Sequence, residues 1–232
     1  MFFDYYYLIL IVPAMLFAFW ASARVNSAFN RYSKVESKRG FTGKDAAEAV
    51  LRKYGIADVE VVSTTGRLTD HFDPRSKVIR LSEDVYSGRN AAAIGVAAHE
   101  AGHAAQHSEG YVPMKLRNAI IPITNIGSNL AMPLFLIGLF MSYYGERYIV
   151  IAYIGIVCFS LSTLFQLLTL PAELNASSRA LSAISGEGIL DEDEIPGAKK
   201  VLSAAALTYV AALAVSLLNL LRLLLIVNRR RN

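Results

Sequence analysis

The chain has little charge, one cysteine and one tryptophan among its 232 residues. Charged residues make up 18% of the composition, whereas a soluble domain usually has about 25%. The single cysteine, Cys158, excludes an intrachain disulfide, and we expect a buried, inert thiol. The basic residues behind the net charge of +4 are spread out and mixed with acids. This distribution is typical of a solvated surface facing a membrane and gives no reason to invoke nucleic acid.

Four long apolar stretches account for the scarcity of charge. They cover residues 3–21, 118–144, 148–170 and 201–227, and only Asp4 and Arg222 carry charge within them. Each stretch reaches the roughly 20 residues that a helix needs to cross about 30 Å of hydrocarbon. The sequence therefore predicts a mainly α membrane protein with about four transmembrane helices.

The first apolar stretch lacks the basic N-terminal flank of a cleaved signal peptide, although Ala21-Ser22-Ala23 resembles a cleavage site. Basic residues instead follow the stretch, so we expect an uncleaved anchor with its N-terminus outside the cell. Alternation of the spans then gives five segments. They are a transmembrane anchor (1–22), a cytoplasmic α+β segment (23–117), a transmembrane hairpin (118–170), a second cytoplasmic segment (171–200) and a last transmembrane helix with a basic tail (201–232).

This topology puts the basic C-terminal tail outside, against the positive-inside tendency. Either the last apolar stretch is a re-entrant or interfacial helix, or the tendency fails in this chain. The sequence leaves both alternatives open.

Residues 99–103 read His-Glu-Ala-Gly-His, which is an HExxH motif. Because residues four apart on a helix share one face, His99 and His103 can both bind one metal ion. Paired imidazoles of this kind bind zinc, and a catalytic zinc site has three protein ligands and one open position. Glu100 stands next to the first ligand, where its carboxylate can take a proton from an activated water. The alternative is a buried, alanine-rich helix whose histidines only form hydrogen bonds.

A third ligand has to come from elsewhere in the chain. His107 follows at the same interval, but eight residues of helix advance about 12 Å, so His99 and His107 cannot share one ion. Glu173 is the predicted third ligand, because it follows the third apolar stretch on the cytoplasmic side, in a run after Pro171 that is typical of the first turns of a helix. A Glu that completes a two-histidine set is a known zinc arrangement. The alternative is a carboxylate at the membrane surface that pairs with Arg179.

The residues between the first two spans predict a small α+β unit. Its elements are a helix over 43–54 with Thr42 as its cap, strands over 59–63 and 77–81, a short helix from Ser82, and the motif helix with Ser87 or Asn90 as its cap. An exposed edge strand can pair with an extended peptide and hold it over a metal. Residues 77–81 are the candidate for this edge, and an ordinary structural strand is the alternative.

A polar cluster, Asp70-His71-Phe72-Asp73-Pro74, offers further side chains to the predicted site. His71 could donate a hydrogen bond to the tetrahedral intermediate, or Asp70 could orient an imidazole ligand. The alternative is an Asp-rich turn before Pro74. Asn175 or Arg179 could likewise stabilise the oxyanion.

These motifs resemble the neutral zinc metallopeptidases of bacterial membranes, the YugP-like proteins. The resembling segments, together with the apolar stretches, cover nearly the whole chain; they are residues 66–74, 78–86, 97–107, 109–111 and 171–181. The order of HExxH, membrane hairpin and returning Glu also resembles the HtpX-type and prenyl-protein membrane proteases. Those proteins usually carry an Asp four residues after that Glu, whereas position 177 is Ser here. The resemblance implies a zincin-like unit, one Zn²⁺ per chain and a zinc-dependent endopeptidase.

The sequence thus predicts an enzyme that hydrolyses peptide bonds in membrane proteins or peptides near the lipid bilayer, for processing or quality control. We expect it in the bacterial cytoplasmic membrane, with the site on the cytoplasmic side. Arg89 and Glu109 flank too short an apolar run for a motif helix inside the bilayer. A non-catalytic metal-binding membrane scaffold is the alternative, and the intact Glu100 argues against it because binding alone does not require that carboxylate.

Overall fold

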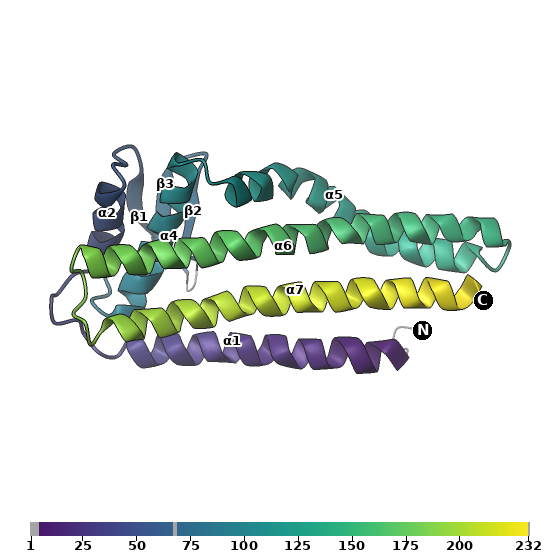
Figure 1. Ribbon diagram of the computed structural model, residues 1–232, viewed down its shortest axis with the longest axis horizontal. Helices are drawn as coiled ribbons and strands as arrows, with labels where there is room; N and C mark the ends of the chain where they lie inside the picture. The colour runs from purple at the N-terminus through teal and green to yellow at the C-terminus, as the bar shows by residue number, and fades with distance from the viewer. Residues whose placement is uncertain (1–4, 67–68, 232) are drawn as a thin grey trace. The chain divides into compact units, whose positions relative to one another are not determined.

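The computed structural model describes residues 5–66 and 69–231 and consists mainly of long helices (Figure 1). Predictions that fall on residues 1–4, 67, 68 and 232 lie outside the described part. The elements in chain order are η1 (Tyr7–Ile11), α1 (Val12–Tyr32), α2 (Gly43–Lys53), β1 (Glu60–Thr64), β2 (His71–Asp73), β3 (Val78–Ser82), α3 (Glu83–Tyr86), α4 (Ala91–Ser108), α5 (Val112–Met141), η2 (Glu146–Tyr148), α6 (Ile149–Gly186) and α7 (Ile195–Arg231).

Contacts divide the chain into two compact units, which we describe separately. We call the first the apolar unit; it comprises Met1–Trp20, Leu116–Leu170 and Thr208–Asn232. We call the second the α+β unit; it comprises Ala21–Lys115 and Pro171–Leu207. The five segments expected from the sequence stay a prediction, because contacts within a chain do not report which side of a bilayer a residue occupies.

Among the residues that the structure describes, four helices are long and apolar enough to cross a membrane. They cover Tyr7–Tyr32, Val112–Met141, Glu146–Gly186 and Ile195–Arg229. Within the apolar unit, large apolar side chains such as Phe140 and Val157 are exposed, as expected where lipid replaces water as the solvent. Together with the small sheet, these helices confirm the prediction of a mainly α membrane protein that carries a small α+β unit.

Two predictions about the long helices need correction or refinement. α6 runs without a break through Pro171, so the predicted new helix after this proline does not begin there. Pro171 lacks an N–H group, but a membrane helix tolerates one missing backbone bond when its neighbours satisfy the freed carbonyl. α7 is a single helix of 37 residues, which is not the form of a re-entrant segment. The side on which α7 ends stays a prediction.

The sheet of the α+β unit has the strand order β1-β3-β2, with β3 parallel to β1 and antiparallel to β2. Its central strand is therefore β3, which corresponds to the predicted strand over 77–81. The interpretation of that strand as a free edge for a peptide is wrong, because both of its edges are paired. In the described part of the chain, no strand pairs with the outer edges of β1 and β2. β2 lies in the cluster where the sequence suggested only polar side chains or a turn.

Helix caps follow the sequence closely. Thr42 and Asp45 form a reciprocal capping box at the start of α2, in which the Thr42 side chain accepts from Asp45 N and Asp45 accepts from Thr42 N. Asn90 caps α4, and its Oδ1 accepts a hydrogen bond of 2.9 Å from Ala93 N. Of the two caps proposed for the motif helix, the structure thus selects Asn90.

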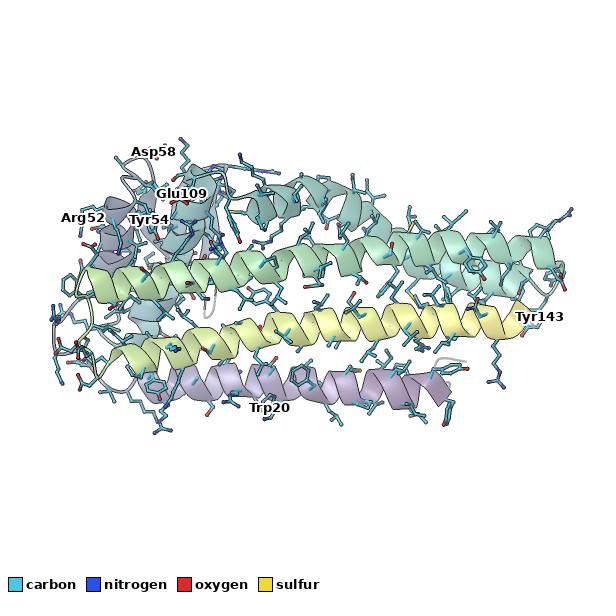
Figure 2. The ribbon with its side chains drawn as sticks, in the orientation of Figure 1. Trp20, Arg52, Tyr54, Asp58, Glu109 and Tyr143 are labelled. Atoms are coloured by element: carbon cyan, nitrogen blue, oxygen red, sulfur yellow. The ribbon has the colours of Figure 1, made fainter. Side chains whose placement is uncertain are left out.

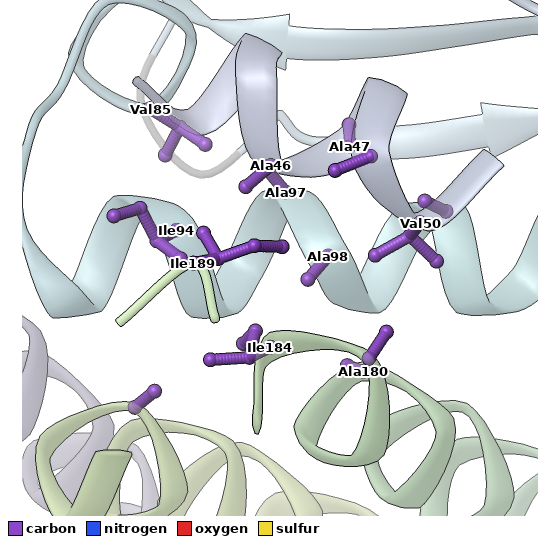
Figure 3. Packing of buried hydrophobic residues seen from close by; sticks show 14 of the residues in the cluster. Ala46, Ala47, Val50, Val85, Ile94, Ala97, Ala98, Ala180, Ile184 and Ile189 are labelled. Carbon is purple, nitrogen blue, oxygen red and sulfur yellow. The ribbon is translucent and has the colours of Figure 1, made fainter. Parts of the chain in front are cut away.

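Small residues fill the core of the α+β unit (Figure 3). α4 packs against α2 through alanines, and on its other side it faces the C-terminal turns of α6, which contribute Ala180 and Ile184. Gly102 lets α4 approach α6 closely, because a Cβ at this position would lie 2.7 Å from the carbonyl oxygen of Ala176. This close approach positions the motif residues against Glu173.

Candidate metal centre

His99 and His103 lie on one face of α4, as their spacing requires. Their rings meet edge to face with centroids 4.7 Å apart. His103 is buried, and His99 is partly buried. Both imidazoles turn Nε2 toward the same neighbour, the carboxylate of Glu173 on α6.

Glu173 is 2% exposed, and its Oε2 lies 3.2 Å from His99 Nε2 and 3.4 Å from His103 Nε2. One ligand atom from each of the three residues lies within 4.8 Å of the others. The structure thus brings together all three predicted ligands, which are separated by up to 74 positions in the chain.

The geometry of these atoms fits zinc. Two ligand atoms with bonds of about 2.0–2.1 Å in a tetrahedral arrangement lie about 3.3 Å apart. The two distances from Glu173 Oε2 to the histidine Nε2 atoms, 3.2 and 3.4 Å, bracket this value. Two nitrogens and one carboxylate oxygen are also a donor set that catalytic zinc sites use.

A second set of contacts fixes the far side of each ring. Ser177 Oγ lies 3.1 Å from His99 Nδ1, and Gln106 Oε1 lies 3.0 Å from His103 Nδ1. Such contacts orient a metal-binding imidazole and select its tautomer. Ser177 occupies the position where the resembling proteases carry Asp, and its hydroxyl contacts His99 in this chain.

Gln106 was not among the site residues predicted from the sequence. Its signal was a single amide among alanines, three positions after His103 and therefore on a neighbouring part of the same face. Many exposed glutamines show the same spacing, and only burial distinguishes this one, which is fully buried.

The charges around His103 favour a cation. Burial is the largest influence on the pKa of His103 and lowers it, but the hydrogen bond to Glu173 and the charges of Glu100 and Glu173 together raise the pKa above its ordinary value. Buried carboxylates need a positive partner, either a proton on an imidazole or a metal ion. A divalent cation satisfies the same need when both imidazoles are neutral.

Glu100 lies outside this three-residue group. Its Oε2 accepts a hydrogen bond of 3.0 Å from the backbone N–H of Phe72 on β2. The Phe72 ring in turn contacts the ring of His107, with centroids 5.8 Å apart. The exclusion of His107 from the ligand set, which rests on helix geometry, stays a prediction.

The other predicted residues have defined contacts. Asp70 accepts hydrogen bonds from Ser82 N at 2.8 Å and Ser82 Oγ at 3.0 Å, so it ties the residue before β2 to the end of β3. Its role in orienting a ligand imidazole stays a prediction. His71 is exposed, and its Nδ1 lies 2.7 Å from Thr69 O. Asn175 Oδ1 accepts from Gln106 and from Arg179. A role at the transition state for His71, Asn175 or Arg179 stays a prediction.

Comparisons with known proteins agree with this site. A family model described as "Putative neutral zinc metallopeptidase" matches residues 7–228. The chain is 48% identical over 220 residues to a protein of Bacillus subtilis (strain 168) named "Putative membrane protease YugP", covering 95% of this chain and 96% of that protein. No solved structure matches the chain. The resemblance inferred from the motifs is confirmed, and the family implies zinc as the cofactor.

Proposed function

The chain belongs to the neutral zinc metallopeptidase family, and on that premise we propose that it is a membrane-bound endopeptidase in which Glu100 is the catalytic base. His99, His103 and Glu173 are the residues that hold the metal. Zinc, when bound, supplies a Lewis acid for the peptide carbonyl and a water of lowered pKa. Glu100 takes the proton of the attacking water and returns it to the leaving amine.

This proposal rests on one observation: Glu173 and Glu100 have different environments and different partners. Glu173 is buried between the imidazoles, whereas Glu100 is partly exposed and bonds to a strand rather than to the ligand set. A site that only stored or carried metal would need the first carboxylate but not the second. A general base has to lie near the site and be free to exchange a proton. Glu100 adjoins the ligand His99 in sequence, its charge acts on His103, and its side chain is partly exposed.

The free edge of β2 is the proposed place for the substrate backbone. β2 pairs with β3 along one edge only, and the N–H of Phe72 donates to Glu100 instead of to β3. An extended peptide that adds to this edge would run beside the proposed base. This edge replaces the strand over 77–81, which is buried in the middle of the sheet.

We further propose that the site faces the cytoplasm of a bacterial cell. The basic residues that follow the first apolar stretch, Arg24, Arg31, Lys34, Lys38 and Arg39, support this orientation. Substrates at this position are membrane proteins or peptides near the bilayer, which fits the name of the Bacillus relative. Processing or quality control of membrane proteins is the corresponding role.

The test is Glu100→Gln in the full-length protein, with casein cleavage and zinc content measured on the same preparation. We expect cleavage to fall about 10²–10⁴-fold, the range that general acid–base catalysis contributes, while zinc stays bound. A chelator should abolish wild-type cleavage and added zinc should restore it. Glu48→Gln on the exposed face of α2 is the matched control and should cleave like the wild type.

A Glu100→Gln protein that cleaves at the wild-type rate would remove Glu100 from the mechanism. If the wild type binds zinc and cleaves no peptide under any condition, the scaffold interpretation takes the place of the enzyme.

A further inference from the structure

Gln106 is a fully buried polar side chain on α4, and its amide makes three hydrogen bonds. Its Nε2 donates to the carbonyl oxygen of Ala172 at 2.7 Å and to Asn175 Oδ1 at 2.9 Å. Its Oε1 lies 3.0 Å from His103 Nδ1. Both N–H groups of the Gln106 amide therefore donate to acceptors on α6, and the amide oxygen faces His103.

The polarity of this amide is fixed by its partners. A backbone carbonyl such as that of Ala172 can only accept, so the atom of Gln106 that faces it has to be the amino group. The same is true at Asn175, because Arg179 Nε donates to Asn175 Oδ1 at 2.7 Å and a guanidinium only donates. Two independent acceptors thus assign the two ends of the Gln106 amide.

Hydrogen bonds thus link His103, Gln106, Asn175 and Arg179 in a chain. The guanidinium of Arg179, at the end of this chain, has further partners that hold it in place. Arg179 Nη2 lies 2.7 Å from Glu109 Oε2, and the hydrogen bond from Arg179 keeps the pKa of Glu109 below its ordinary value. The guanidinium also lies 5.5 Å from the ring centroid of Tyr54 and 5.9 Å from that of Tyr111. Tyr54 and Glu109 are labelled in Figure 2. Arg179 is always protonated and can only donate, so the directions of the hydrogen bonds in this chain cannot be reversed.

We propose that Gln106 is a positioning residue that, supported by Asn175 and Arg179, keeps His103 in the tautomer with hydrogen on Nδ1. An amide oxygen only accepts, so His103 carries a proton on Nδ1. When a metal ion takes the place of a proton between Nε2 and Glu173, a neutral His103 then presents the lone pair of Nε2 to that ion. This inference rests on the proposed metal site. It assigns the two histidines different properties, because Ser177 can donate to His99 or accept from it.

The direct test is nitrogen NMR on full-length protein labelled with ¹⁵N-histidine. The chain has four histidines, and the variants His71→Gln and His107→Gln leave the signals of His99 and His103 alone. Ser177→Ala then identifies His99 by its shift. Glu173→Ala removes the carboxylate that competes for a proton on Nε2. In this metal-free variant at alkaline pH we expect His103 to be protonated at Nδ1, and a His103 protonated at Nε2 would overturn the proposal. This measurement needs no variant of Gln106 and no substrate.

Variants of Gln106 test the consequence for metal binding. Gln106→Met keeps the length of the side chain without its hydrogen bonds, and we expect it to weaken zinc binding by about 10–100-fold in a chelator competition. Gln106→Glu keeps an acceptor beside Nδ1, so His103 should keep its Nδ1 proton in this variant. In Gln106→Met this acceptor is absent, and His103 should lose its preference for the Nδ1 tautomer. Asn90→Ala, which removes the cap of the same helix, is the control for general destabilisation and should bind zinc like the wild type.

Equal zinc affinity of Gln106→Met and Asn90→Ala would reduce Gln106 to a structural residue and overturn the proposal. If Gln106→Met does not fold, the NMR result for the Glu173→Ala protein, which keeps Gln106, decides alone. Failure of the catalytic proposal has a different signature, namely an active Glu100→Gln protein with an unchanged His103 tautomer.

Discussion

The two units of this molecule bury different groups. In the apolar unit, large side chains such as Phe140 (63% exposed) and Leu136 (44% exposed) face outward. In the α+β unit, Ile184 and alanines of α2 and α4 such as Ala46 and Ala98 are fully buried. Lipid can solvate the first surface, whereas the second has to be sealed by protein packing. We infer that the apolar unit combines its own buried cluster around Phe135 and Ile156 with an outer surface solvated by lipid, whereas the α+β unit depends on its own core.

Their buried polar groups differ in the same way. The apolar unit pairs neutral hydroxyls, such as Thr163 and Ser216 at 2.7 Å. The α+β unit buries a carboxylate, Glu173, between two imidazoles. Neutral pairs are satisfied once they meet, but a buried carboxylate still requires positive charge. The buried carboxylate that requires a cation therefore lies in the α+β unit.

Among the tests of this difference between the units, we expect removal of Glu173 to have the largest effect, which is a loss of zinc binding. We expect Glu173→Ala to weaken zinc binding by at least about a hundredfold, because loss of one member of a buried charged set costs about 3–5 kcal/mol. Zinc content after dialysis against a weak chelator measures the effect. Glu146→Ala, at the exposed turn before α6 in the apolar unit, should leave zinc content unchanged. Equal retention of zinc by both variants would exclude Glu173 as a ligand.

Truncation of apolar side chains tests the packing half of the comparison. Ile184→Ala should lower the free energy of unfolding by about 2–5 kcal/mol, the usual cost of a cavity in a sealed core. Leu136→Ala removes a side chain that lies 44% exposed, and lipid fills its place, so we expect a loss below about 1 kcal/mol. Unfolding of both proteins in the same bilayer mimetic gives the answer. A larger loss for Leu136→Ala would contradict the assignment of that surface to lipid.

Two glycines of α4 give a finer test within the α+β unit. A Cβ at Gly102 would lie 2.7 Å from Ala176 O, whereas the nearest atom to a Cβ at Gly95 is Ala198 Cβ at 3.3 Å. Gly102→Ala should destabilise the protein by about 1–3 kcal/mol and weaken zinc binding as α4 moves from α6. Gly95→Ala should cost less, because alanine favours the helix by about 1 kcal/mol. If both variants bound zinc like the wild type, close contact of these helices would not set the site.

The smallest expected effect is that of pH on the stability of the metal-free protein and on its zinc affinity. Because the pKa of His103 is raised in the folded, metal-free protein, its contribution to stability is present below the ordinary pKa of about 6.5 and is lost as pH rises through the folded value. Zinc displaces this proton, so zinc affinity should rise with pH, up to about tenfold per unit, and level off above the folded pKa. Metal-free stability and zinc affinity should thus change in opposite directions, and parallel changes would contradict the assignment.

The sequence predicted the parts of the fold that depend on local pattern. The four apolar stretches, the caps Thr42 and Asn90, and the HExxH helix follow from composition and spacing. Glu173 was also chosen from the sequence, because alternation of the spans returned it to the side of the motif. Its role as a ligand is still a proposal, although the structure places its carboxylate between the two histidines.

The misses depend on long-range contacts. β2 has three residues, which is too short for alternation to be visible, and the order of the strands follows from pairing rather than from any one segment. Pro171 predicted a break because the sequence does not show what surrounds a helix. Gln106 was passed over because its partners, Ala172 and Asn175, lie more than 60 positions away.

X-ray absorption spectroscopy at the zinc edge of the purified, full-length protein tests the central claim most directly. We predict two imidazole nitrogens and at least one carboxylate oxygen at about 2.0–2.1 Å, no sulfur, and loss of the oxygen contribution or of the metal in Glu173→Ala. A sulfur ligand, or a spectrum with a single imidazole, would contradict the metal centre formed by His99, His103 and Glu173.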